Sequence, residues 1–377
     1  MFLTEEQAMI QKVAHDLAQE QIAPHAREVD ETGEFPWKNI RLLAEHGFFG
    51  VHVPEAYGGI GADMVSHALV VEEIAAACAS TSVALSTQAL VIGPLLIGGN
   101  EEQKERYVTP LARGEVLGSC GITEPGAGSD VSSIRTKAEK NGNDYILNGR
   151  KVFITNAGES EIYVIVARTS EHRTKGISLF IVGKGTPGLS FGKKEDKMGI
   201  RGSATRDVIL ENVIVPKENM IGLEGEGFSI MMNVFNETRP IVGAQALGIA
   251  RGAYDYVREY VKERKQFGKA LSDFQMVQAM LSDMAMQIEA SKLLVYQAAL
   301  MIDRKQPRVP LNSAMAKCFA SDTAMKVTTD AVQLMGGYGF IKEYPLERMM
   351  RDAKITQIYE GTNQIQRLII AKQILGG

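Results

Sequence analysis

The segment AKITQIYEGTNQIQ, residues 353–366, contains one acid, Glu360, whose surroundings could make it a base. Ile355, Ile358 and Tyr359 precede this acid, and a glycine follows it directly. Burial among apolar side chains raises the pKa of a carboxyl group above its reference value of about 4.3 and so makes it a stronger base. The competing interpretation is an exposed acid at a helix end, and the segment considered alone favours that one.

A polar, glycine-rich loop, GITEPGAGSD at residues 121–130, could bind a ligand. Gly126 and Gly128 permit backbone conformations and close approaches that a side chain would block. Thr123, Ser129 and exposed amides could then hydrogen-bond a flat, polar heterocycle. A structural turn explains the same composition, and composition alone favours the turn.

Two further segments end expected helices with residues that could hold a nucleotide. In RKQFG, residues 264–268, Arg264 could bind a phosphate through two parallel hydrogen bonds and Phe267 could pack on an adenine. Cations at a helix C-terminus are also favourable for dipole reasons alone. In QLMGGYGF, residues 333–340, consecutive glycines indicate either a helix C-cap or a close backbone approach to a ligand.

Several common site motifs are missing from the sequence. It has neither GxGxxG after a strand nor GxxxxGK[ST], and its six histidines show no HExxH spacing, so no metal site is expected. GLSFG, residues 188–192, matches the G-x-S-x-G nucleophile pattern, which requires a strand before it and a helix after it. Pro187 precedes the motif and a lysine-rich, turn-like stretch follows, so we interpret Ser190 as a loop or strand serine.

Composition indicates an ordinary soluble globular protein. The 377 residues are 45% hydrophobic and 23% charged, and the net charge of −4 gives no reason to expect nucleic acid as a partner. Cys78, Cys120 and Cys318 form no CxxC pair, which favours a reducing cytoplasm. The N-terminus lacks the features of a signal peptide. The longest apolar run, near residues 89–99, is judged too short to span a bilayer.

The elements that must position these residues follow the order α, β, α. Thr4 and Gln7 have capping-box spacing, and helices are expected after Pro36, over 63–79 and from Asn100. From about 117 to 216, short β-branched runs alternate with turns, including two Asn-Gly pairs at 141–142 and 148–149. Long helices are then expected over 228–260, 272–304 and 311–335.

We therefore predict an α+β multidomain fold. It consists of an N-terminal helical domain (1–116), a middle antiparallel β-sandwich or barrel domain (117–226) and a C-terminal helical domain resembling a four-helix bundle (227–377).

Four segments resemble the FAD-dependent acyl-CoA dehydrogenases of the short- and medium-chain type. They are TEPGAGSD, ERKQFGK, DAVQLMGGYGF and MRDAKITQIYEGTNQIQRLIIA, and they occur in that family's order over the whole chain. The resemblance implies the same three-domain fold, with FAD between the β domain and the C-terminal bundle. It also implies a homotetramer, a dimer of dimers, in which a neighbouring subunit completes each FAD site.

The resemblance assigns individual residues to FAD and substrate. Arg264, Phe267 and Gln275 would hold the pyrophosphate and adenosine across the dimer interface. Many relatives have Trp where this chain has Phe153, which lacks an indole N–H, so electron transfer to the partner could differ here. The FAD residues implied are Cys120, Ile122, Thr123, Gly128, Ser129, Phe153, Ile154, Thr155, Arg264, Phe267, Gln275, Gln333, Gly336, Gly337, Thr362 and Gln364. The substrate residues implied are Ser129, Asn236, Arg239, Tyr359 and Gly361.

Glu360 acquires a role from the resemblance. It would remove the α-proton of an acyl-CoA thioester while hydride leaves the β-carbon for flavin N5, and electrons would pass to an electron-transfer flavoprotein. The base's own backbone N–H and a flavin ribityl hydroxyl would polarise the thioester carbonyl. Some relatives place the base just before the arginine that matches Arg239, where this chain has Thr238. Glu237 is one residue away and would point about 100° around the helix, so we reject it.

The sequence leaves more than one possible substrate and more than one possible activity. The position of the base favours a short- or medium-chain straight acyl group, or a methyl-branched short one. The helix around residues 80–96 would form the pocket floor, but its residues do not measure chain length. Another flavoenzyme on the same fold, such as an oxidase, a nitroalkane oxidase or a monooxygenase, is a second class. A non-catalytic protein that binds acyl-CoA is a third.

Overall fold

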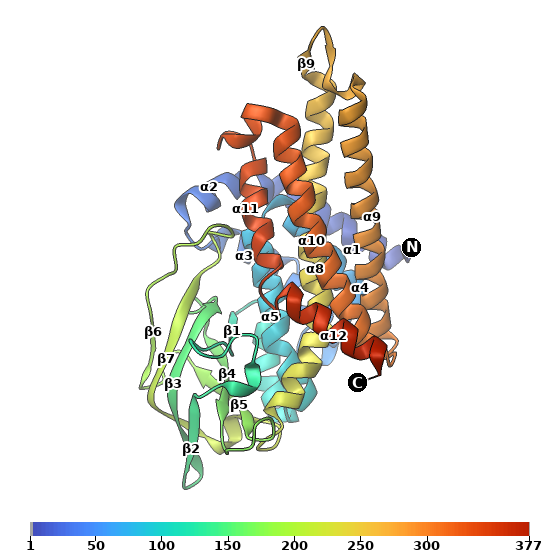
Figure 1. Cartoon of the computed structure of the whole chain (residues 1–377). Coiled ribbons are helices and arrows are strands. Elements are labelled where there is room, and N and C mark those ends of the chain that lie inside the picture. The colour runs from blue at the N-terminus through green and yellow to red at the C-terminus, as the bar shows by residue number, and fades with distance from the viewer. Residues whose placement is uncertain (1–2, 377) are drawn as a thin grey trace.

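The computed structural model describes residues 3–376 and shows a helical N-terminal domain, a middle β-sheet domain and a helical C-terminal domain (Figure 1). The sheet lies beside the lower half of a long helical bundle. The expected capping box at Thr4 forms, and Asn100, where a helix was expected to begin, makes a capping box with Gln103. The N-terminal helices are α1 Glu5–Leu17, α2 Ala26–Thr32, α3 Trp37–Glu45, α4 Met64–Ala77, α5 Ala79–Gly98, α6 Glu101–Gln103 and α7 Thr109–Ala112.

Helix α5 corrects one expectation from the sequence. Its 20 residues are long and apolar enough to cross a membrane, because the helix starts ten residues before the apolar run at 89–99. Among the residues that the structure describes, no other helix meets this test, and 78% of the apolar window in α5 is buried inside the protein. A core helix has the same composition as a membrane span, and α5 is apolar around its circumference because other elements cover all of its faces.

The middle domain contains one eight-stranded sheet in the order β6-β7-β3-β2-β4-β5-β8, with β1 also paired to β4. Most pairs are antiparallel, as expected, but β1 pairs with β4 in parallel, so the sheet is mixed. About forty residues separate these two strands, which is long enough for a parallel connection. The strands are β1 Gly118–Gly121, β2 Lys137–Asn141, β3 Asp144–Thr155, β4 Ile162–Arg168, β5 Ile177–Gly183, β6 Leu189–Phe191, β7 Thr205–Pro216 and β8 Met220–Ile221.

Only one of the two Asn-Gly pairs makes a turn. Asn141 ends β2 and Gly142 begins the two-residue turn to β3, whereas Asn148 and Gly149 lie inside β3. There the register against β7 shifts, and the Asn148 carboxamide exchanges hydrogen bonds of 3.2 and 2.7 Å with Asn212. The second pair therefore forms a β-bulge rather than a turn, because β7 pairs with β3 both before and after it.

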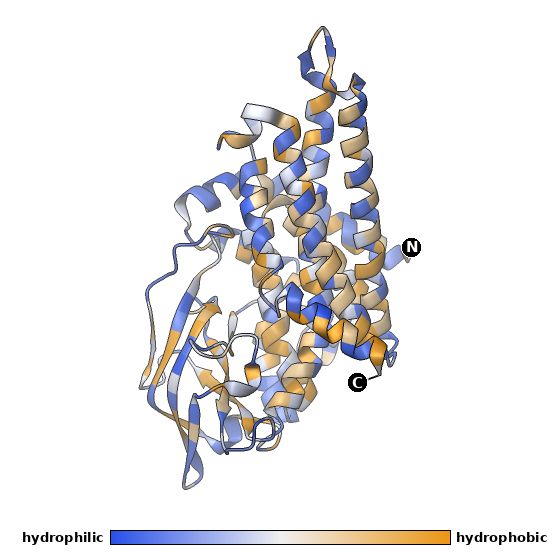
Figure 2. Cartoon of the chain, in the orientation of Figure 1, coloured by the Kyte–Doolittle hydropathy of each residue, from blue (hydrophilic) through white to orange (hydrophobic). Residues whose placement is uncertain are grey.

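The C-terminal domain is built around α8 Gly227–Glu263, which packs against α4, α9 Gln275–Asp303 and α10 Val309–Met335. Helices α8, α9 and α10 confirm the three long helices expected from the sequence, to within three residues at each end. A two-stranded turn, β9 Lys265–Gln266 and β10 Lys269–Ala270, joins α8 to α9 at the far tip. Helices α11 Leu346–Thr356 and α12 Asn363–Leu375 complete the domain. Figure 2 shows long apolar stretches on the central helices, whereas the β2–β3 hairpin is mostly hydrophilic.

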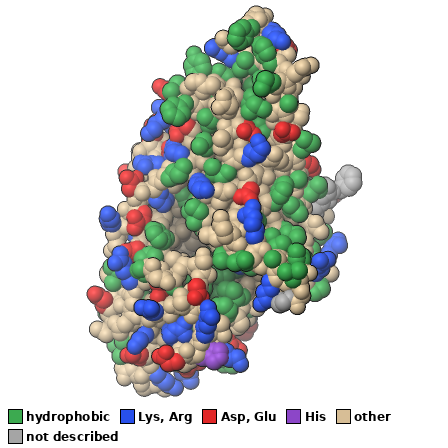
Figure 3. Space-filling view, in the orientation of Figure 1, with side chains coloured by type: hydrophobic (Ala, Val, Ile, Leu, Met, Phe, Trp, Pro, Cys, Tyr) green, Lys and Arg blue, Asp and Glu red, His purple; other side chains and the backbone are tan. Residues whose placement is uncertain are grey.

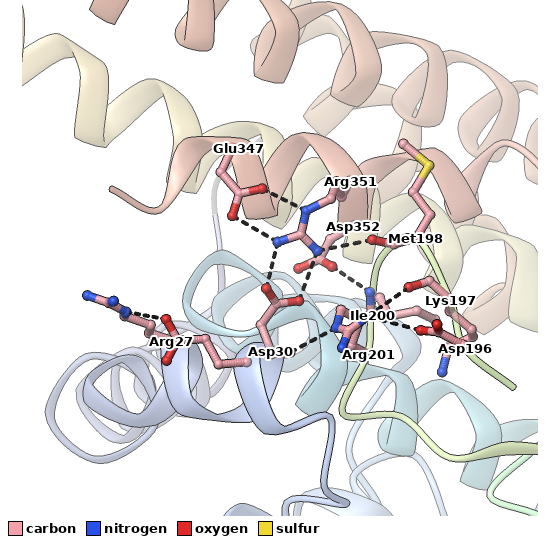
Figure 4. Close-up of polar contacts among 11 residues, drawn as sticks. Arg27, Asp30, Asp196, Lys197, Met198, Ile200, Arg201, Glu347, Arg351 and Asp352 are labelled. Carbon is pink, nitrogen blue, oxygen red and sulfur yellow. Dashed lines mark hydrogen bonds and ion pairs between the residues drawn. The ribbon is translucent and has the colours of Figure 1, made fainter. Parts of the chain in front are cut away.

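The three domains meet at a polar junction, which we call the α11 clasp (Figure 4). The Arg351 guanidinium on α11 donates to both carboxylate oxygens of Asp30 on α2, at 3.0 and 2.6 Å, and to Glu347 one turn earlier on its own helix. The neighbouring Asp352 carboxylate accepts from the Ile200 amide of the β domain at 2.5 Å. The clasp ties α11, which ends four residues before Glu360, to both other domains.

A buried histidine, His67, and a partly buried one, His52, give a testable pH dependence of stability. The rings of His52 and His67 lie 4.5 Å apart, and neither ring nitrogen of His67 has a partner among residues 3–376. Burial lowers the pKa of His52 to about 4 and that of His67 well below 6.5. Below pH 6.5 the unfolded chain therefore binds protons that the folded chain does not. Because each of the two histidines contributes up to about 1.4 kcal/mol per pH unit, we expect the free energy of unfolding to fall by about 2 kcal/mol per pH unit between about pH 6.5 and pH 4.

Urea unfolding at a series of pH values measures this effect. The double variant His52→Gln, His67→Leu should have a shallower slope than the wild type in that window. Equal slopes in the two proteins would show that the pair does not titrate on unfolding.

Candidate active site

A cavity of about 410 Å³ lies where the three domains meet. Helix α5 and helix α8 form one side, the loop after β1 and strand β3 form another, and the α11–α12 connection closes the third. Figure 3 shows this face of the molecule hollowed between the sheet and the C-terminal helices. Many lining side chains are apolar, including Val83, Leu90, Met232, Phe235 and Val242.

The structure brings twelve of the predicted site residues to this one cavity, from four separate stretches of chain. This group includes the expected base and most of the glycine-rich loop. The residues that line the cavity are Cys120, Ile122, Thr123, Gly128, Ser129, Phe153, Ile154, Thr155, Arg239, Tyr359, Glu360 and Gly361.

Three predicted residues lie close to the cavity without lining it. The Asn236 carboxamide accepts from Arg239 Nη1 at 3.0 Å and so contacts a residue of the wall. Thr362 caps α12 by accepting from the Ile365 amide at 3.3 Å, and Gln364 is exposed in the first turn of that helix.

The other predicted FAD residues form a second group near the upper end of the bundle (Figure 1). Arg264 follows α8 and its guanidinium lies 5.3 Å from the ring centre of Tyr338, next to the Gly336–Gly337 turn. Phe267 is 93% exposed, and added Cβ atoms on Gly336 or Gly337 would meet nothing within 4 Å. These residues do not line the cavity of their own chain. A role in FAD binding would therefore require a second copy of the chain, as the resemblance implies, and it stays a prediction.

The turn that carries Glu360 has an unusual backbone. Glu360 has a φ of 54° and Gly361 a φ of 90°, both in the left-handed region that non-glycine residues rarely adopt. Gln366 donates from behind to the Glu360 and Gly361 carbonyls at 3.1 and 2.9 Å. The φ of 90° requires glycine at position 361, where an added Cβ atom would also lie 2.8 Å from Gln366 Nε2. Strain held in place by surrounding contacts is common at functional sites.

The Glu360 side chain is held by one hydrogen bond inside the cavity wall. Its Oε2 accepts from Thr238 Oγ1 of α8 at 2.7 Å. Burial raises the pKa of Glu360, while the Thr238 hydrogen bond and the nearby charges of Arg239 and Lys317 oppose that rise. The net effect is a raised pKa, so Glu360 is a stronger base than an exposed glutamate. The structure thus contradicts the interpretation of Glu360 as an exposed helix-end acid.

The glycine-rich loop is both a turn and a wall of the cavity. Lys151, which is fully buried, donates to the Ile122 carbonyl at 3.1 Å and to Glu124 at 2.7 Å. The Glu124 carboxylate also accepts from the amides of Arg135 and Thr136 at 2.6 and 2.9 Å. This buried ion pair fixes the start of the loop, while its glycines remain open.

The cavity wall fits a flat, aromatic cofactor. Gly126 and Gly128 have nothing within 4 Å of an added Cβ, so a planar ring could approach the backbone there. Phe153 of β3, on the same side of the cavity as the loop, has a φ of 60° and remains 67% exposed, which is unusual for a large aromatic side chain. Thr123, Ser129 and Thr155 add hydroxyl groups to the same wall.

Sequence reasoning missed several residues that support this site. Thr238, Gln245, Lys317 and Gln366 contact the 359–361 turn from α8, α10 and α12, and Lys151 supports the loop. Most have no local signature, because all of them except Gln366, which lies five residues after Gly361, act on a partner distant in the sequence. The exception is Lys317, whose setting in AMAKCFAS, among small and apolar residues of a helix, signals a buried cation.

Comparisons with known proteins agree over the whole chain. Three family models match: the acyl-CoA dehydrogenase N-terminal domain at residues 4–115, the middle domain at 119–213 and the C-terminal domain at 225–375. The short-chain specific acyl-CoA dehydrogenase of Clostridium acetobutylicum is 46% identical, with 99% of this chain and 98% of that protein covered.

Two solved structures show the same fold. The butyryl-CoA dehydrogenase of Megasphaera elsdenii is 46% identical with a TM-score of 0.97, covering 100% of this chain and 99% of that one. A chain in the structure described as the electron transferring flavoprotein of Acidaminococcus fermentans is 48% identical with a TM-score of 0.98, and both chains are covered completely. The chain therefore belongs to the acyl-CoA dehydrogenases, a family of flavoprotein oxidoreductases that act on CH–CH bonds.

Proposed function

We propose that this protein catalyses the FAD-dependent α,β-dehydrogenation of a short- to medium-chain acyl-CoA to the trans-2-enoyl-CoA. The observation that carries the proposal is Glu360, a carboxylate of raised pKa in the same cavity as the glycine-rich loop and Phe153. A base and a site for a flat oxidant must lie on either side of one acyl group for this reaction. When bound, FAD accepts the hydride that leaves the β-carbon of the acyl group.

Individual residues around the cavity have separate roles in the proposed reaction. Glu360 takes the α-proton onto its carboxylate, and Thr238 holds one carboxylate oxygen in place. The thioester carbonyl gains negative character as that proton leaves. Among residues 3–376 no acceptor engages the Glu360 amide, so we assign it as a donor to this carbonyl. Arg239, buried in the wall, adds positive charge nearby.

The cofactor would be held by two copies of the chain. The loop residues Thr123 and Ser129 and the β3 residues 153–155 would contact the isoalloxazine. Arg264, Phe267 and Gln275 of a neighbouring copy would hold its pyrophosphate and adenosine, because they lie away from the cavity of their own chain. The other contributors would be Gln333, Gly336, Gly337, Thr362 and Gln364.

The cavity supports a short acyl group. Its volume of about 410 Å³ must accommodate the flavin ring as well as the acyl chain. Apolar side chains from α5, α8 and α12 surround the remaining space, which suits an alkyl group rather than a charged one. The names of the Clostridium and Megasphaera relatives also indicate short-chain substrates.

Assembly and partners follow from the same proposal. Exposed apolar side chains at the tip and along α12, such as Phe267, Met276, Phe340 and Leu375, favour a homotetramer built as a dimer of dimers. The structural relative from Acidaminococcus supports an electron-transfer flavoprotein as the electron acceptor. Three free, buried cysteines favour the cytoplasm. We also retain 1–116, 117–226 and 227–377 as the proposed domain boundaries.

The decisive experiment is an anaerobic titration of the purified flavoprotein with acyl-CoAs from C4 to C12, followed by flavin absorbance. We expect the short-chain substrates to bleach the flavin band at the lowest concentrations. Isobutyryl-CoA and 2-methylbutyryl-CoA test the methyl-branched alternative. Rapid oxygen consumption with substrate would indicate an oxidase or monooxygenase instead, and a protein that no acyl-CoA bleaches would contradict the proposal.

A further inference from the structure

Lys317 on α10 is a buried cation next to the turn that carries Glu360. Lys317 is 0% exposed, and its Nζ donates to the Gly361 carbonyl and to Asn363 Oδ1, each at 2.8 Å. No carboxylate within residues 3–376 forms an ion pair with it. Burying an ammonium group without a charged partner is unfavourable, so a lysine at this position lowers the stability of the folded protein.

The contacts of Lys317 are themselves fixed. The Asn363 carboxamide donates to Ser321 Oγ at 2.9 Å and to Asp322 Oδ1 at 2.7 Å, so its oxygen is oriented toward the ammonium. Ser321 Oγ donates in turn to the Lys317 carbonyl at 2.7 Å. The cation is therefore locked between α10, the start of α12 and the Gly361 carbonyl.

Neutral donors could make the same two hydrogen bonds, so the positive charge needs a separate explanation. The charged and titratable groups that act on Lys317 are Glu360 on the turn, Arg239 on α8, and Cys318 and Asp322 on its own helix. Burial lowers the pKa of Lys317 to about 8, so the group remains mostly protonated at pH 7. Its charge in turn favours the ionised form of Glu360, which burial disfavours.

We propose that Lys317 is a positioning residue for the base: its ammonium fixes the Glu360–Gly361 turn from behind and supplies positive charge that keeps the partly buried Glu360 ionised. Lys317 is not among the residues that line the cavity, so its effect on the reaction would pass through Glu360. This inference rests on the proposed function, in which Glu360 must be ionised before it can accept the α-proton.

The test is the pH dependence of flavin reduction in the holoenzyme, measured by anaerobic rapid mixing with saturating butyryl-CoA from pH 5.5 to 9. In Lys317→Gln the hydrogen-bonding group stays and the charge is lost. We expect the acid limb of the rate profile to move up by about one pH unit, which is a tenfold loss of ionised base below that limb. Lys317→Arg should restore the wild-type limb.

A second variant covers the case in which Lys317→Gln does not fold. Asn363→Asp is nearly isosteric and places a carboxylate against the ammonium. It is combined with Asp322→Asn, because Asn363 donates to Asp322 Oδ1 at 2.7 Å and two carboxylates there would repel each other. The pair of changes should cancel the charge of Lys317 and raise the acid limb in the same direction. Lys326→Gln is the matched control, since Lys326 lies on the same helix but is exposed and pairs with Asp330. Its profile should equal that of the wild type.

The outcomes separate this inference from the proposed function. One outcome is that the wild type is reduced normally and the acid limb does not move in Lys317→Gln or in the Asn363→Asp variant. This result would overturn the role of Lys317, even if the variants melt at lower temperatures, and would leave the dehydrogenase proposal standing. No reduction of the wild type by any acyl-CoA would overturn the dehydrogenase proposal itself. A second measurement needs no turnover. The melting temperatures of the wild type and Glu360→Gln are compared over a range of pH, and the same comparison is repeated in the Lys317→Gln background. The pH at which the two melting curves diverge reports the pKa of Glu360, and it should be higher in the Lys317→Gln background.

Discussion

Replacing Glu360 by Gln is expected to slow flavin reduction by an acyl-CoA about 1,000-fold, because a carboxamide cannot accept the α-proton. Glutamine has nearly the same shape, and its side-chain oxygen can still accept the hydrogen bond from Thr238, so the turn should keep its conformation. Flavin content and melting temperature should remain close to those of the wild type. Anaerobic rapid mixing with butyryl-CoA measures the rate directly.

The control for this variant is Glu237→Gln, one residue before Thr238 on α8. Burial also raises the pKa of Glu237, so it is the alternative acid nearest to the base position used by some relatives. It does not line the cavity, and its substitution should change the reduction rate less than threefold. A large loss in Glu237→Gln combined with a small one in Glu360→Gln would show that the base has been assigned to the wrong residue.

Replacing Arg351 by Met should destabilise the protein by about 3 kcal/mol, because two carboxylates would lose their shared cation. The guanidinium satisfies Asp30 and Glu347 together, and both carboxylates are mostly shielded from water, with side chains 11% and 18% exposed. The loss should also loosen α11, which leads into the catalytic turn. Urea unfolding measures the stability, and flavin reduction measures the effect on the site.

A matched control lies in the same region of Figure 4. Arg27 pairs with Glu31 on α2 at 2.7 Å, but these side chains are 57% and 46% exposed. Exposed pairs of this kind contribute about 0.5 kcal/mol or less, so Arg27→Met should be nearly neutral. Equal losses in the two variants would mean that the α11 clasp adds no more stability than a surface ion pair.

The helical parts of the fold could be predicted from the sequence because their signals are local. The capping residues Thr4 and Asn100 and the helical spacing of apolar residues act within one or two turns. The sheet was less predictable. Asn148 and Gly149 form a bulge rather than a turn because β7 pairs on both sides of them, and that pairing partner lies some sixty residues away.

By itself, the sequence determined the order of the domains, the family and the residue that we assign as the base. Those features are encoded in continuous motifs, such as the segment that contains Glu360. Only the tertiary structure decided which groups surround that residue. Thr238 lies 122 positions from Glu360 and Lys317 lies 44 positions from Gly361 in the sequence. Burial and the approach of distant charges set the pKa of a carboxyl group, and both arise only when separate helices pack together.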